Sequence, residues 1–165
     1  MGITPLASQE TAKEKEVDTR TLEQKIQWLT DIEAIRNLMA RYCHGIDKQD
    51  ETSFMSIWAD DATYELPRGI KSGLQGINEL VHKVWREVPK CHHHITNPLI
   101  SVDQDEASAL TDVIYYRQTD DGTLQLLSGT YAMTFRRVAG AWKIHHLKFS
   151  SFGTLSPVFA QNNRL

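Results

Sequence analysis

CHHHITNPLISVDQDEASALTDVIYYRQTDDGTLQLLSGTYAMTFRRVAGAWKIHHLKFSS, residues 91–151, is the stretch that decides the fold. It contains four segments with the composition and pattern of β-strands, near residues 91–103, 106–118, 124–137 and 141–151. Two short sequences between them, TDDGT at 119–123 and VAG at 138–140, suit tight antiparallel connections. The stretch therefore predicts an antiparallel β-meander.

The residues before the meander are patterned as helices. An apolar stripe with a spacing of three or four predicts one long helix or two consecutive helices; it consists of Ile26, Leu29, Ile32, Ile35, Leu38, Tyr42 and Ile46. The sequence TDIE at 30–33 fits a capping box, so a second helix is expected to begin near Asp31. Residues 51–58 are expected to form a short helix, 62–66 a short strand and 77–88 a helix with one buried face.

Helices followed by a run of strands predict an α+β fold, with one antiparallel sheet covered on one face by helices. A sheet that curls around its helices leaves a pocket between them, and pockets are where ligands bind. The length of 165 residues favours one domain. We expect this domain over residues 21–155, between a flexible N-terminal tail at 1–20 and a C-terminal tail at 156–165.

The composition excludes several classes of function. A formal net charge of -3 gives no general attraction to nucleic acid or to an anionic membrane. We find no secretory signal and no apolar segment long enough to span a bilayer, so a cytoplasmic protein is expected. The two cysteines, Cys43 and Cys91, form no CxxC pair, so neither a disulfide framework nor a cysteine-rich zinc site is indicated.

Three consecutive histidines, His92, His93 and His94, stand at the start of the first meander strand. Successive side chains of a strand point to opposite faces, so His93 is expected on one face and its two neighbours on the other. The run therefore cannot supply three ligands to one metal ion, and no spacing of a known zinc site supports a third ligand from elsewhere. If the face of His93 is concave, Ile95, Asn97 and Leu99 share it.

Asp47 is the candidate partner of His93. It follows Ile46 at the expected end of the long helix, just after Gly45, where a carboxylate could turn into the mouth of the pocket. A hydrogen bond from Nδ1 of His93 to Asp47 would fix the tautomer of the imidazole and leave Nε2 to accept a proton. The alternatives are a hydrogen-bonded core histidine and an ordinary carboxylate at a helix end.

Four motifs together resemble the SnoaL-like group of the nuclear transport factor two-like superfamily. They are RYCHGID at 41–47, IWADDATY at 57–64, HHITN at 93–97, and GTY at 129–131 followed by GAWKI at 140–144. Their order and spacing are similar to those of hexachlorocyclohexane dehydrochlorinase, scytalone dehydratase and the bile-acid dehydratases. The resemblance implies a cone-shaped α+β barrel, in which a curved, mostly antiparallel sheet wraps around about three N-terminal helices.

The resemblance also implies which residues form the site. The catalytic dyad of the family matches Asp47 and His93. The positions matched to the substrate pocket, each of which could equally be ordinary core packing, are Tyr42, Tyr64, Val113, Tyr115, Tyr131, Leu147, Phe149 and Ser151. Cys43 is a further candidate for the pocket from helix spacing, since it lies one turn before Asp47. Leu147 and Ser151 stand where related enzymes can have arginine, for which Arg117 or His145 could compensate. Tyr42, Tyr115 or Tyr131 could instead donate a hydrogen bond to a developing oxyanion.

The function that the sequence predicts is a cofactor-independent lyase of the dehydratase or dehydrochlorinase type. Its substrate would be a small hydrophobic, ring-containing or aromatic molecule. We expect the protein to bind no metal, nucleic acid or membrane. The chain is expected to form a homodimer or homotrimer. The same dyad could run an isomerisation or a polyketide cyclisation. A second class is a non-catalytic binding or assembly module, such as the small subunit of a ring-hydroxylating dioxygenase.

Overall fold

The computed structural model describes residues 18–119 and 122–155. Its elements are α1 (Leu22–Asp47), α2 (Glu51–Met55), β1 (Trp58–Leu66), β2 (Gly69–Ser72), α3 (Gly73–Glu87), β3 (Cys91–Asp103), β4 (Glu106–Gln118), β5 (Leu124–Val138) and β6 (Ala141–Leu155). The predicted tails, apart from residues 18–20, lie outside the described residues. No described helix is both long and apolar enough to cross a membrane.

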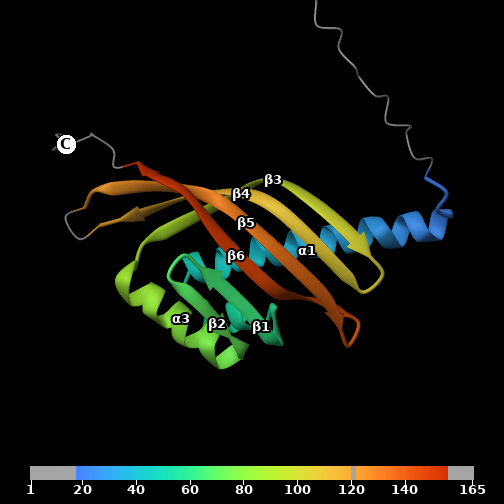
Figure 1. Ribbon diagram of the computed structural model, residues 1–165, viewed down its shortest axis with the longest axis horizontal. Coiled ribbons are helices and arrows are strands. Elements are labelled where there is room, and N and C mark those ends of the chain that lie inside the picture. The colour runs from blue at the N-terminus through green and yellow to red at the C-terminus, as the bar shows by residue number, and fades with distance from the viewer. Residues whose placement is uncertain (1–17, 120–121, 156–165) are drawn as a thin grey trace, which may run out of the picture.

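The strands form one curved, open sheet of six strands in the order β2-β1-β6-β5-β4-β3, with the helices gathered on one face (Figure 1). All neighbouring strands are antiparallel except β1 and β6, which are parallel. The α+β class and the mostly antiparallel meander predicted from the sequence are therefore confirmed. The inner face of the sheet and the buried sides of α1 and α3 enclose the core.

Strand β2 is the element that sequence patterning missed. It spans only Gly69–Ser72, and all four of its residues are exposed. A short strand at the edge of a sheet buries no side of itself, so it has no alternation of apolar and polar residues to read.

Helix α1 is one continuous helix, and the expected second start near Asp31 is wrong. The capping box lies instead at Thr21, whose hydroxyl accepts from the backbone N–H of Gln24. Asp31 is buried, and its carboxylate is satisfied there by hydrogen bonds from Trp142 Nε1 at 2.9 Å and from Arg137 at 2.8 Å. These bonds tie the middle of α1 to β5 and β6.

The first turns of α1 extend beyond the sheet (Figure 1). As a result, Ile26 and Leu29 of the predicted apolar stripe are exposed, whereas Ile35 and Leu38 further along are buried. The stripe is continuous in sequence, but only the part that faces the sheet is covered.

A bulge changes the faces of β3. The pairing with β4 shifts between Thr96 and Leu99, and Asn97 has a φ of 44°. Up to this point the alternation holds, with His93 and Ile95 inward and their neighbours exposed. Asn97 and Leu99 are exposed and do not share the face of His93, which corrects the expectation of a regular strand.

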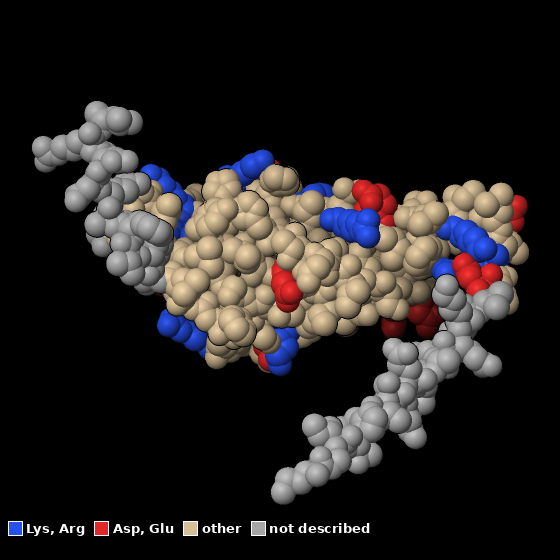
Figure 2. Space-filling model, turned by 90° about the horizontal axis from the view of Figure 1, so that it is seen from above, with Lys and Arg blue, Asp and Glu red and all other residues tan. Residues whose placement is uncertain are grey.

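Charged side chains are spread over the surface rather than gathered. Figure 2 shows a face on which Lys, Arg, Asp and Glu lie singly or in small groups among uncharged residues. Such a distribution provides no continuous basic stripe on this face for a phosphate backbone to follow.

Candidate active site

Asp47 and His93 meet where the end of α1 lies over the start of β3. His93 Nδ1 is 2.5 Å from Asp47 Oδ1, and the backbone N–H of His93 donates to Asp47 Oδ2 at 2.8 Å. Both side chains are only 6% exposed. The carboxylate is thus held by two bonds from one residue, which fixes the ring and the carboxylate relative to each other.

Aromatic rings hold the imidazole of His93 on two sides. Tyr115 on β4, the Cα partner of His93, stacks on it with ring centroids 4.8 Å apart and planes 16° from parallel. Tyr42 of α1 contacts it edge-on at 6.1 Å. Nδ1 is engaged by Asp47, whereas Nε2 has no hydrogen-bond partner among the residues that the structure describes. Nε2 is therefore free to meet a ligand.

Cys91 provides a further contact to the carboxylate. Its thiol lies 3.6 Å from Asp47 Oδ1 and is a donor to it. Burial would raise the pKa of Asp47, but the hydrogen bonds from His93 and Cys91 outweigh burial and lower the pKa of this carboxyl below its usual value. Burial and the nearby Asp47 charge raise the pKa of the Cys91 thiol to about 12, so the thiol stays protonated at neutral pH.

The same three residues are one group that could hold a metal ion. Ligand atoms of Asp47, Cys91 and His93 lie within 4.8 Å of one another. Binding an ion there would require removal of the protons from the thiol and from Nδ1. His92 and His94 point away from this group, and His94 Nε2 is paired at 2.9 Å with the hydroxyl of Tyr116.

His93 faces a cavity of about 490 Å³ between α3 and the inner face of the sheet. One wall is the apolar side of α3, formed by Ile77, Leu80, Val81, Val84 and Val88. The opposite wall is the sheet, formed among others by Tyr64, Tyr115, Leu127, Tyr131, Phe149 and Ser151. A mainly apolar cavity with a few polar groups is typical of a site for a small molecule.

The structure brings most of the predicted pocket residues to this cavity. Those that line it together with His93 are Tyr64, Tyr115, Tyr131, Phe149 and Ser151. Tyr42, Val113 and Leu147 are fully buried in the core behind the wall. Cys43 faces a different groove, on the far side of His93.

Three tyrosine hydroxyls form a buried network beside the cavity. Tyr42 Oη lies 2.5 Å from Tyr64 Oη and 3.2 Å from Tyr131 Oη. Burial raises the pKa of Tyr64 to about 12 and that of Tyr42 and Tyr131 well above the usual value. The hydroxyls therefore remain protonated near neutral pH and serve as hydrogen-bond donors rather than bases.

Sequence reasoning did not foresee two of the polar groups at the cavity, Cys91 and Arg68. Cys91 carried a signal, since it is two residues before His93 on one strand and so shares its face. Arg68 carried none, because it lies in the turn between β1 and β2. Of the two cationic candidates, Arg117 lines the cavity, whereas His145 lines a hollow on the outer face of the sheet.

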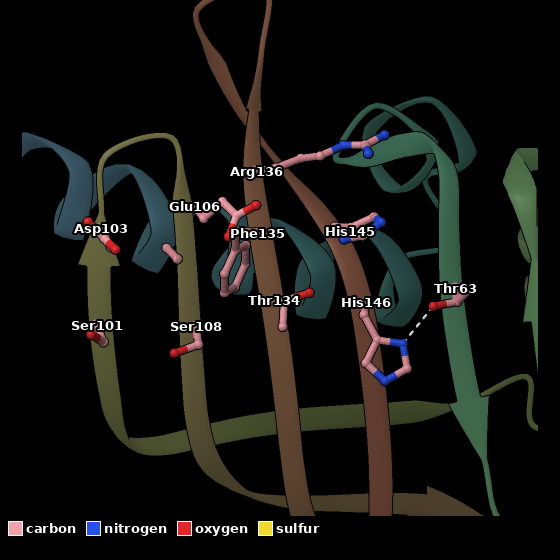
Figure 3. A pocket seen from close by; sticks show the side chains of 11 residues that line it. Thr63, Ser101, Asp103, Glu106, Ser108, Thr134, Phe135, Arg136, His145 and His146 are labelled. Carbon is pink, nitrogen blue, oxygen red and sulfur yellow. Dashed lines mark hydrogen bonds between the residues drawn. The ribbon is translucent and has the colours of Figure 1, made fainter.

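That outer hollow, of about 810 Å³, is formed by outward side chains of five strands (Figure 3). Thr63 Oγ1 and His146 Nδ1 lie 2.6 Å apart in it. A groove of about 650 Å³ also lies between α1 and β3 and contains Asp47 and His44. His93 alone, among the described residues that line the inner cavity, also lines this groove. The inner cavity is the candidate active site because it combines His93 with the mainly apolar wall and with most of the predicted pocket residues.

An open, curved sheet around helices, with a buried carboxylate–imidazole pair facing an apolar cavity, places the protein in the nuclear transport factor two-like class of cone-shaped α+β folds. Within that class the chain belongs to the SnoaL-like family, whose domain model matches residues 27–148.

Comparison with known proteins finds three similar proteins. Hexachlorocyclohexane dehydrochlorinase 1 of Sphingobium indicum is 29% identical over 118 residues, which are 69% of this chain and 77% of that protein. The structure of a type 3 hexachlorocyclohexane dehydrochlorinase from Novosphingobium barchaimii superimposes with a TM-score of 0.76 at 25% identity, over 81% of this chain and 94% of the other. A putative scytalone dehydratase from Novosphingobium aromaticivorans, 19% identical over 82% and 93% of the two chains, shares the fold with a TM-score of 0.74.

Proposed function

We propose that the protein is a cofactor-independent lyase that eliminates water or hydrogen chloride from a small hydrophobic, ring-containing molecule. The observation that carries this proposal is the pairing of Asp47 with His93 Nδ1, which leaves Nε2 unpartnered beside an apolar cavity. Similarity to the dehydrochlorinase of Sphingobium indicum supports an elimination reaction.

In the proposed reaction His93 Nε2 takes a proton from a carbon of the substrate. The electron pair of the broken C–H bond forms a C=C bond, and the leaving group departs from the neighbouring carbon with its bonding pair. It leaves as chloride, or as water after receiving a proton. The Asp47 carboxylate stabilises the imidazolium that forms, as in other carboxylate–histidine pairs. No electrons are gained or lost overall, so the chemistry requires no redox cofactor.

Tyrosine hydroxyls are the proposed donors to the developing negative charge. Tyr64 and Tyr131 line the cavity and are oriented from behind by Tyr42, while Tyr115 lies against His93 itself. A neutral hydroxyl with a raised pKa donates a hydrogen bond without ionising. These residues thus take the place of an arginine on β6, where Leu147 and Ser151 stand.

The test is turnover of a panel of chlorinated cyclohexanes and cyclic β-hydroxy ketones by the purified full chain, followed by mass spectrometry. We expect a product lighter by one HCl or one water. Replacing the base by His93→Gln should lower the rate by about 10²- to 10⁴-fold. The matched control is His92→Gln, which changes a neighbouring histidine on the exposed face and should leave the rate unchanged.

An undiminished rate in His93→Gln would contradict the proposal. A product of unchanged mass would instead identify an isomerase or a cyclase that uses the same dyad. A chain that binds the panel without any turnover would be a binding module.

The exposed apolar residues Leu99, Leu110 and Ile114 support our further proposal of a homodimer or homotrimer, which light scattering measures.

A further inference from the structure

Two arginines, Arg68 and Arg117, lie among the residues that line the active-site cavity. No aspartate or glutamate stands among the described lining residues, so neither positive charge is neutralised by the wall. A cationic group at an otherwise apolar cavity is unfavourable unless a ligand or solvent compensates its charge. The cavity is therefore expected to prefer ligands that are negatively charged as well as hydrophobic.

Arg117 lies one inward position further along β4 than Tyr115, the residue opposite His93. It is two residues beyond Tyr115 on β4, so both side chains lie on the inner face, and its Cα partner on β3 is Cys91. Its Nε donates to Gln125 Oε1 at 2.8 Å, which orients the guanidinium. Within the described part of the chain it has no carboxylate partner, unlike Arg137, which bonds Asp31. Its outer nitrogens are left to donate to a ligand.

Arg68 lines the same cavity from the far side of the sheet, because β6 and β5 lie between β1 and β4. Strands β1 and β4 both run in the direction of β6, because β1 is parallel to β6 and β4 is two antiparallel steps away. Arg117 is the next-to-last residue of β4, and Arg68 follows the end of β1. Arg68 is exposed and has no ion pair with another described residue, so it lies at the rim.

We propose that the substrate of this cavity carries a carboxylate on its hydrophobic ring system, that Arg117 binds this carboxylate, and that the positive charge of Arg68 at the rim adds to its attraction. Arginine suits the role because its planar fork donates two parallel hydrogen bonds to a carboxylate. Residues two apart on a strand are about 7 Å apart, roughly the width of a fused ring. The anionic group is thus held within about one ring of the carbon that faces His93. This inference rests on the proposed function for the identity of the cavity.

The test is binding of two probes that differ only in charge, 2-naphthoate and 2-naphthamide, measured by calorimetry with the full chain. We expect the naphthoate to bind at least about 10-fold more tightly than the amide. Arg117→Gln should remove most of this preference, and the double change with Arg68→Gln should abolish it, with amide affinity unchanged. Arg86→Gln, an exposed arginine of α3 away from the cavity, is the matched control and should keep the preference.

Equal affinity of the wild-type chain for the two probes would overturn the inference, as would a preference that survives in the double variant. The amide affinity reports whether the cavity of each variant is intact. If Arg117→Gln loses amide binding as well, the single variant Arg68→Gln decides the result. A reduced preference for naphthoate over the amide then supports the inference, and an unchanged preference contradicts it. Binding needs no turnover, so a failure of the elimination chemistry leaves this outcome readable.

Discussion

The substitution Asp47→Asn tests the hydrogen bond on which the site depends, because it keeps the shape of the side chain and removes its charge. In the native site Oδ2 accepts from the backbone N–H of His93 and Oδ1 lies 2.5 Å from Nδ1. The introduced amide can still accept the backbone bond with its oxygen. Its NH₂ group then faces Nδ1, so His93 must move its proton to Nε2 to accept there.

The expected magnitudes follow from this exchange. A charge-assisted hydrogen bond of about 1.5–3 kcal/mol is replaced by a neutral one of about 1 kcal/mol, so the free energy of unfolding should fall by about 0.5–2 kcal/mol. For a chain of this size such a loss lowers Tm by about 1–8 °C. The rate should fall much further, by about 10²- to 10⁴-fold, because Nε2 carries a proton and no longer acts as a base.

The assay pairs kinetics with ¹⁵N NMR of the imidazole, which reports the protonated nitrogen directly. Asp50→Asn is the matched control: Asp50 caps α2 by accepting from the backbone N–H of Ser53 at 3.0 Å, and asparagine caps a helix equally well. We expect the proton of His93 on Nδ1 in the wild type and in the control, and on Nε2 in Asp47→Asn. A variant that stays within about 5-fold of the wild-type rate, or that keeps its proton on Nδ1, would refute this account.

Three further outcomes follow from buried groups elsewhere. Asp31→Asn should cost about 1–3 kcal/mol at pH 7, since Arg137 loses one of its two carboxylate partners and keeps Asp105. Hydrogen bonds lower the pKa of Asp31 despite its burial, so this stabilisation exists above the usual carboxyl pKa of 3.8 and is lost as the pH falls below that value. The urea midpoints of the variant and the wild type should therefore converge at low pH. Gly129→Ala should lower Tm and reduce probe binding, because a Cβ would collide with the backbone oxygen of Ser150, and a thermal melt that matches the wild type would exclude this collision. Burial raises the pKa of Cys43 from 9.0 to about 12, so at pH 9 the fraction of thiolate, and with it the reaction with a thiol reagent, should be about 500-fold lower in the native chain than in urea; equal rates would contradict its burial.

The meander was predictable because its information is local. Each strand alternates with a period of two, and the intervening turns carry glycine or a short polar sequence. The observed β3 and β4, Cys91–Asp103 and Glu106–Gln118, have the predicted bounds. Strand β6 continues to Leu155, four residues further than expected, because its end pairs with β5 across an irregularity at Ser128 and Gly129. Such an irregularity breaks the period from which the bound was read.

Burial of a charged group was not predictable from its neighbours in sequence. TDIE at 30–33 has the pattern of a helix start, and only the tertiary structure shows why Asp31 lies in mid-helix instead. The partners that satisfy it, Arg137 and Trp142, are 106 and 111 residues away. Local sequence rules assign an aspartate to a helix cap or to the surface, because they do not consider hydrogen-bond partners on other helices or strands.

The proposed catalytic pair was predictable from local sequence, whereas the position of the arginines was not. His93 could be placed because strand alternation fixes its face, and Asp47 because it stands at a helix end. That Arg68 and Arg117 line one cavity depends on the parallel pairing of β1 with β6, which makes the ends of β1, β4 and β6 point the same way. No periodicity encodes that pairing, since β1 would show the same pattern beside any strand. Among the described residues, those at the ends of β1 and β4 are therefore where further contacts to a ligand should be sought.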